Sequence, residues 1–233
     1  MRGTGRLWSA LVDELRQRLT FENRLATESL LLVILLWYGV QLGVLYLGWT
    51  VEQWQWTFTT ESFPQLSPGL VLAIISHDPP PNVTHILGNV AFLWLFAGES
   101  EQHMRRVEVV GFFVATALVS VTVSTALTGD STLGASGGAL AFAGFYGTHL
   151  YLAHWDSTEL ETMERTWREA ATLRAYWRVA IVALPLALIA YGIGQYVGLV
   201  PVGRTDVVGH LVGVMLGAGY AVGRGSDIIH WRS

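Results

Sequence analysis

The 233-residue sequence contains no cysteine and no lysine, and few charged residues of any kind. Without cysteine, disulfide bonds, thiolate-ligated zinc and thiol catalysis are excluded. Charged residues make up only 14% of the chain, against roughly 25% in an average soluble domain. Hydrophobic residues make up 52%, the mean hydropathy is +0.41 and the formal charge is −4, which does not fit a nucleic-acid-binding protein. The composition predicts a polytopic membrane protein.

Six hydrophobic stretches could cross the ~30 Å hydrocarbon core of a bilayer as helices, and the second of them is shorter than the others. They are residues 29–49, 83–98, 109–127, 134–152, 179–199 and 207–223. The fifth contains Pro185, which predicts a kink rather than an end. We therefore expect an all-α bundle of six transmembrane helices.

Arginine placement orients this bundle. Thirteen of the 14 arginines precede the first span, follow the second or fourth span, or lie in the tail, and Arg204 is the exception. Because arginine-rich loops stay in the cytoplasm, both termini are predicted to be cytoplasmic, in a multi-pass protein of the cell membrane.

Three regions follow from this topology. Residues 1–28 form a cytoplasmic N-terminal segment with apolar side chains at helical spacing, 29–223 form the transmembrane domain, and 224–233 form a cytoplasmic tail. The outer loop at 50–84 is rich in aromatic residues, and we expect it to dip into the headgroup layer.

Polar residues lie near the start of the second, fourth and sixth spans. His85 and Asn89 are four residues apart and share a helix face, Ser136 lies among glycines, and His210 follows Gly209. Polar groups at membrane depth are costly, so they suggest a function. Because these three spans all begin outside and run inward, the residues are expected at comparable depth near the outer face.

This layer holds the groups that a serine hydrolase needs. Ser136 would be the nucleophile and a neutral His210 the base that takes its proton. His85, Asn89 and the Ser136 backbone N–H would stabilise the developing oxyanion.

Glycines explain how the serine and the base could meet. Gly209, Gly213 and Gly217 recur at every fourth position and leave one side of the sixth helix without side chains. Such a stripe lets two membrane helices approach closely. If the fourth span is the partner, His210 can reach the Ser136 hydroxyl.

The polar and glycine residues group into four motifs, which are His85-x-x-x-Asn89, Gly98 with Glu101, Gly134-Ala135-Ser136-Gly137, and Gly209-His210-x-x-Gly213-x-x-x-Gly217. The region 64–223 that holds them resembles the rhomboid family of intramembrane serine proteases. The resemblance implies a Ser136–His210 dyad with His85 and Asn89 in the oxyanion site. It also implies that the substrate is a transmembrane segment of another membrane protein, hydrolysed near the outer face without metal or cofactor. The expected partners are such substrates and membrane lipids, and no nucleic acid.

The chain departs from the family pattern at three places. The outer loop has no arginine where many relatives have a Trp-Arg pair, and Leu140 stands where some relatives have a tyrosine. The stretch from Asp78 to Asn82, with three prolines, is a local peculiarity before His85.

Other interpretations of the same residues remain open. Ser136 could be a small residue at a helix crossing, His210 a packing or proton-relay histidine, and Asn89 a bridge between helices. Glu101 is expected to be structural, and Asp206 could orient His210 or simply lie at the interface.

Two further functions also compete with the protease. An inactive relative would bind transmembrane helices without cutting them. A transporter is disfavoured, because the sequence has no internal repeat and its polar layer is near one end rather than the midplane. The sequence contains no H-E-x-x-H motif, so a zinc protease is unsupported, and no pair of intramembrane carboxylates, so an aspartyl protease is unsupported as well.

Overall fold

The computed structural model describes residues 24–61, 67–80, 82–153, 187, 190, 193 and 206–230. These residues form helices and connecting loops, with no strand among them. The helices are α2 (Leu25–Tyr46), α3 (Val51–Phe58), α4 (Gly69–Leu72), the 3-10 turn η2 (Ala73–Ile75), α5 (Val83–Ser100), α6 (Arg106–Thr128), α7 (Ser136–Ala153) and α10 (Val207–His230). The all-α prediction is confirmed for the described part of the chain.

Five of the six predicted spans coincide with long helices. These are α2, α5, α6, α7 and α10, while the fifth predicted span and Pro185 lie outside the described residues apart from three isolated positions. Residues 1–23, with most of the predicted N-terminal segment, also lie outside them. The helix ends differ from the predicted span ends: α2 begins at Leu25 rather than at 29, and α10 continues to His230. Hydropathy marks where a helix can meet lipid, whereas caps and local propensity decide where it stops.

Three of the described helices are long and apolar enough to cross a membrane. They are Leu25–Tyr46, Arg106–Thr128 and Val207–Arg224. α7 is not among them, and its central residues Ala139, Phe142 and Phe145 are fully or almost fully buried. A helix that other helices cover does not need to match lipid along its whole length. The chain is a multi-pass membrane protein.

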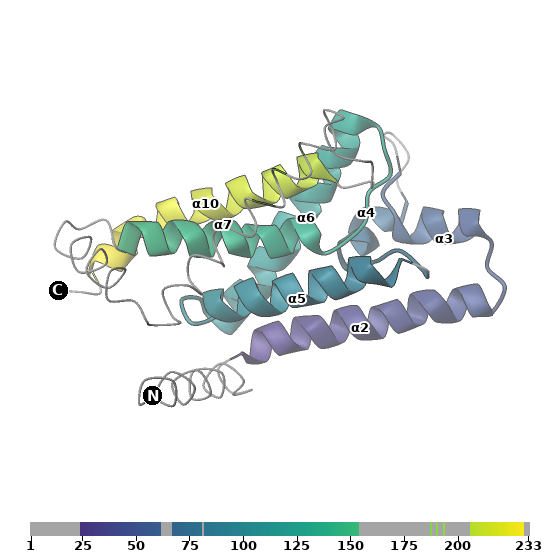
Figure 1. Cartoon of the computed structure of the whole chain (residues 1–233), viewed down its shortest axis with the longest axis horizontal. Helices are drawn as coiled ribbons and strands as arrows, with labels where there is room; N and C mark the ends of the chain where they lie inside the picture. The colour runs from purple at the N-terminus through teal and green to yellow at the C-terminus, as the bar shows by residue number, and fades with distance from the viewer. Residues whose placement is uncertain are drawn as a thin grey trace, which may run out of the picture.

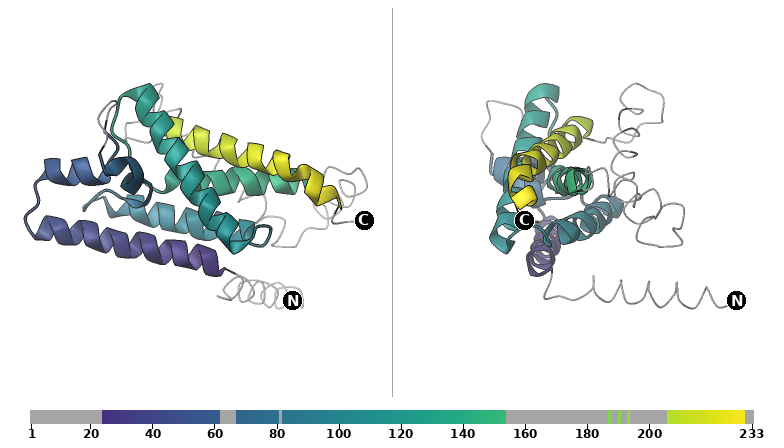
Figure 2. Two further views of the ribbon diagram at one scale, coloured as in Figure 1. Left: turned by 180° about the vertical axis from the view of Figure 1, so that it is seen from behind. Right: turned by 90° about the vertical axis from the view of Figure 1, so that its left-hand side faces the viewer.

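α7 lies inside the bundle, with α10 running alongside it and α5 on another side (Figure 1). α6 runs steeply across α7 and α10 when the molecule is seen from behind (Figure 2). α2 packs against α5 and α6. α5, α7 and α10 all begin at the end of the bundle that also carries α3 and α4 (Figure 1), which we call the α3–α4 end.

The predicted outer loop is folded rather than extended. The α3 helix begins at a capping box in which Thr50 and Gln53 bond to each other's backbone. Its last residue, Phe58, is buried against Trp37 of α2, with ring centroids 5.6 Å apart, and against Trp54, at 5.5 Å. Aromatic packing therefore fastens α3 to α2 at the α3–α4 end of the bundle.

The buried Glu101 ties α5 to α2 at the opposite end. Its two carboxylate oxygens accept hydrogen bonds from the backbone N–H groups of Ala26 (2.8 Å) and Thr27 (2.9 Å), and from the Thr27 hydroxyl (2.7 Å). These N–H groups belong to the first turn of α2, where no intrahelical partner exists. The predicted structural role of Glu101 is confirmed.

Candidate active site

The four predicted site residues lie at the beginnings of three helices. His85 is in the first turn of α5, with Asn89 one turn later, Ser136 is the first residue of α7, and His210 is in the first turn of α10. Because these helices begin at the same end of the bundle (Figure 1), the structure brings the four residues to one end, as the sequence predicts.

The turn before Ser136 rests directly on His85 and Asn89. Gly134 has φ +123°, a conformation that residues with a side chain rarely adopt, and its N–H donates to the Ala73 carbonyl at 2.9 Å. A Cβ atom at Gly134 would lie 2.9 Å from His85 Nε2 and 3.5 Å from Asn89 Nδ2. Glycine is therefore required here by both the backbone angle and the space, and it lets His85 Nε2 approach the start of α7.

The predicted glycine stripe of α10 does pack against α7. A Cβ atom on Gly213 would overlap the Gly137 carbonyl, and one on Gly217 would overlap the Ala141 carbonyl. At the start of the stripe, a Cβ on Gly137 would lie 3.7 Å from the Gly209 carbonyl oxygen. The two backbones are thus in contact, as expected for a small-residue helix interface in a membrane.

This contact places the neighbours of Ser136 and His210 side by side. Gly137 follows Ser136, and Gly209 precedes His210. The His210 N–H donates to the Asp206 carbonyl at 3.1 Å, and no hydrogen bond joins the Ser136 and His210 side chains among the described residues. The dyad itself remains a prediction.

Asp206 caps α10. Its Oδ1 accepts hydrogen bonds from the Gly209 N–H at 2.8 Å and from the Ser124 hydroxyl at 2.5 Å. The first bond satisfies a free N–H of the first helical turn, and the second ties α10 to α6. The sequence left open whether Asp206 orients His210 or lies at the interface, and these bonds show a third role, a cap at the start of α10.

Two residues that the sequence did not assign to the site contact His85. Asp78 Oδ2 lies 3.0 Å from His85 Nδ1 and accepts a hydrogen bond from Asn82 Nδ2 at 2.8 Å. The contact with His85 lowers the pKa of Asp78, against the opposing effect of partial burial. The fully buried His77 ring packs on the His85 ring, with centroids 5.3 Å apart. Burial, with His85 nearby, lowers the pKa of His77 to about 3, so His77 is neutral at physiological pH.

The segment that carries His77 and Asp78 is anchored on α2. The Trp37 indole N–H donates to the Ser76 hydroxyl at 3.0 Å, and the Gln41 side chain accepts from the His77 N–H at 3.0 Å and donates to its carbonyl at 3.4 Å. The same segment binds Gly134 through Ala73. One piece of chain therefore holds both the turn before Ser136 and the residues next to His85.

The model of the rhomboid domain matches residues 69–226, which is more than half of the chain. The chain belongs to the rhomboid family. The rhomboid domain begins at α4, ends within α10, and contains all four predicted site residues. No curated protein matches the chain significantly. The resemblance to the rhomboid family that the motifs indicated is thus confirmed. The family includes serine proteases.

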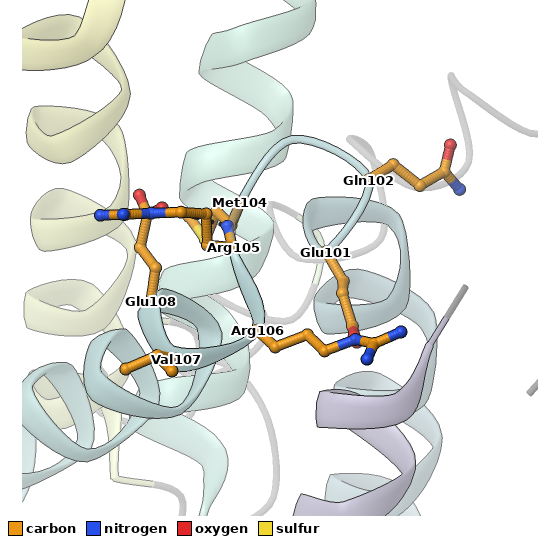
Figure 3. A pocket seen from close by; sticks show the side chains of 7 residues that line it. All are labelled: Glu101, Gln102, Met104, Arg105, Arg106, Val107 and Glu108. Carbon is orange, nitrogen blue, oxygen red and sulfur yellow. Dashed lines mark hydrogen bonds between the residues drawn. The ribbon is translucent and has the colours of Figure 1, made fainter. Parts of the chain in front are cut away.

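A pocket elsewhere in the rhomboid domain lies at the opposite end of α5 (Figure 3). It is lined by residues of the α5–α6 connection, namely Glu101, Gln102, Met104, Arg105, Arg106, Val107 and Glu108. It is more than about 20 Å along α5 from His85, at 1.5 Å per helical residue. Glu108 there forms an ion pair with Arg224 of α10 at 2.7 Å. Among the described residues, no group of three His, Asp or Glu side chains could hold a metal ion.

Proposed function

We propose that this rhomboid-family chain is an intramembrane serine endopeptidase, which uses Ser136 as nucleophile and His210 as general base. The observation that carries the proposal is the position of the Gly134–Ser136 turn. It lies against His85 and Asn89 on one side, while the next residue, Gly137, lies against α10 beside His210. This arrangement supports a reaction centre that a serine, a histidine base and oxyanion donors from three helices would share.

The reaction proceeds in two steps. His210 takes the proton of the Ser136 hydroxyl while the oxygen attacks the peptide carbonyl. The C–N bond then breaks, and His210 gives its proton to the leaving amine. Water, activated by the same imidazole, hydrolyses the acyl-enzyme and regenerates Ser136.

The oxyanion would be stabilised by His85, Asn89 and the backbone N–H of Ser136. His85 Nε2 and Asn89 Nδ2 both lie against Gly134, two residues before the nucleophile. The first N–H groups of α7 have no carbonyl partner within the helix, so they are available as donors. Removing one such donor typically reduces kcat by about 100- to 1000-fold.

The family and the arginine distribution supply the membrane context of the proposal. The domain would have six transmembrane helices in the cell membrane, with both termini cytoplasmic and the site near the outer face. The substrates would be transmembrane segments of other membrane proteins, surrounded by membrane lipids. No metal, cofactor or nucleic acid takes part.

Cleavage of a model transmembrane substrate in liposomes tests the proposal. Ser136→Ala and His210→Ala should each reduce cleavage by at least about 1000-fold. Ser131→Ala is the matched control, because this exposed serine lies in the connection before α7 and should leave cleavage unchanged. Equal cleavage by wild type and Ser136→Ala would instead favour a non-catalytic relative that binds transmembrane helices.

A further inference from the structure

Asp78 is the carboxylate next to the proposed oxyanion site. Its Oδ2 lies 3.0 Å from His85 Nδ1, and its side chain is 40% exposed, against 26% for His85. The opposite ring nitrogen, Nε2, faces Gly134, where a Cβ atom would lie 2.9 Å away. The imidazole therefore lies between a carboxylate on one side and the turn that carries Ser136 on the other.

The fold fixes the position of Asp78 independently of His85. The two preceding residues are bonded to α2, Ser76 through Trp37 and His77 through Gln41. Asn82, directly before α5, donates to the same Asp78 oxygen at 2.8 Å. The neutral His77 ring contacts the His85 ring edge to face and brings no positive charge that would compete for the carboxylate.

Proton placement follows from the partners of the ring. Asp78 and His85 lie at ion-pair distance without the geometry of a hydrogen bond, and a carboxylate, which only accepts, favours a proton on the nitrogen nearest to it. A carboxylate at ion-pair distance stabilises an imidazole that donates a hydrogen bond from its other nitrogen to an oxyanion. A charged donor forms a stronger hydrogen bond than a neutral one.

We propose that Asp78 is a positioning residue of the oxyanion site: its carboxylate holds His85 through Nδ1, so that Nε2 faces the Ser136 turn and donates to the oxyanion. The inference rests on the proposed protease function. Asp78 touches no substrate atom in this scheme and acts only through His85.

A double-mutant cycle in the cleavage assay separates this role from a general structural one. Asp78→Asn should lower kcat by about 10- to 100-fold with little change in KM, and no more than His85→Ala does. In the His85→Ala background, Asp78→Asn should change kcat by less than about twofold, because Asp78 affects the reaction only through the His85 side chain. Asp130→Asn is the matched control, since it removes an exposed carboxylate from the α6–α7 connection at the same end of the bundle. Effects of Asp78→Asn that are equally large in both backgrounds would overturn the proposal.

A spectroscopic readout tests the pair without any catalysis. In protein labelled with 15N-histidine, the His85 side-chain resonances are identified by their loss in His85→Ala. Asp78→Asn should shift the His85 Nδ1 resonance, and Asp130→Asn should not. An unshifted His85 resonance would refute the pairing itself, whereas a shift in a protein that cleaves nothing would refute the protease function and leave the pairing standing. Thermal unfolding of the same samples shows whether Asp78→Asn remains folded.

Discussion

Replacing Gly134 with alanine perturbs the site where the turn before Ser136 contacts His85 and Asn89 of α5. The backbone at φ +123° favours glycine, and forcing a side chain into such a region costs about 1–3 kcal/mol. The new Cβ would lie 2.9 Å from His85 Nε2 and 3.2 Å from Cε1, where ordinary contact begins near 3.4 Å. The ring or the turn must therefore move by about 0.5 Å. A misplacement of about 1 Å can cost 100-fold in rate, so we expect Gly134→Ala to lower kcat by about 10- to 100-fold.

Gly129→Ala provides the matched control for this prediction. Gly129 ends α6 at φ +73°, and, its chain neighbours apart, no atom of the described residues lies within 4 Å of a Cβ placed there. Its alanine variant carries a backbone cost of about 1–2 kcal/mol without touching His85. Thermal unfolding in detergent and cleavage kinetics on both variants compare stability with catalysis. Wild-type kcat in folded Gly134→Ala, or an equal loss of kcat in Gly129→Ala, would refute the reasoning.

Three further predictions concern the packing around the site. Gly213→Val pushes α10 away from the Gly137 carbonyl and should lower both thermal stability and cleavage. Gly219→Val, where a Cβ would meet no atom of the described residues within 4 Å, should change neither; equal effects would contradict the close helix contact. Glu101→Gln weakens the bonds that begin α2 and should lower the free energy of unfolding by about 1–3 kcal/mol, measured in denaturant, and unchanged stability would refute the capping role. The pKa of His77 is about 3 in the folded protein and 6.5 in the unfolded chain, so the folded state binds fewer protons. The free energy of unfolding should therefore fall as the pH drops from 6.5 towards 3, by up to about 1.4 kcal/mol per pH unit. His77→Phe should remove this part of the pH dependence from unfolding curves, and an unchanged slope in the variant would contradict the assignment to His77.

The helices and the glycine contacts could be predicted because they follow from local patterns. Apolar stretches of about 20 residues must be helical in lipid, and glycines at every fourth position must line one helix face. Gly213 and Gly217 therefore lie against the backbone of α7, as expected. The structural role of Glu101 was predicted as well, although its partners on α2 were not.

The neighbours of His85 could not be predicted in the same way. Asp78 is seven residues before His85 and separated from it by prolines, so no helical or strand period relates the two. Their contact depends on how the loop is fastened to Trp37 and Gln41, which are far away in sequence. From the spacing of Asp206 and His210, Asp206 could either orient the His210 ring or lie at the interface, and the cap that its carboxylate forms with the Gly209 N–H and the Ser124 hydroxyl was not predicted. An acid that close to a helix start can cap the helix or reach a side chain, and only the fold decides between them.

Labelling with a fluorophosphonate probe tests most directly whether the surroundings of Ser136 activate its hydroxyl. The purified protein in detergent or liposomes would be treated with the probe, and the modified peptide mapped by mass spectrometry. We expect one adduct on Ser136, retained in Ser131→Ala and lost in His210→Ala. Folded wild-type protein that takes up no probe and cleaves no transmembrane substrate, or an adduct that forms equally well without His210, would contradict the account.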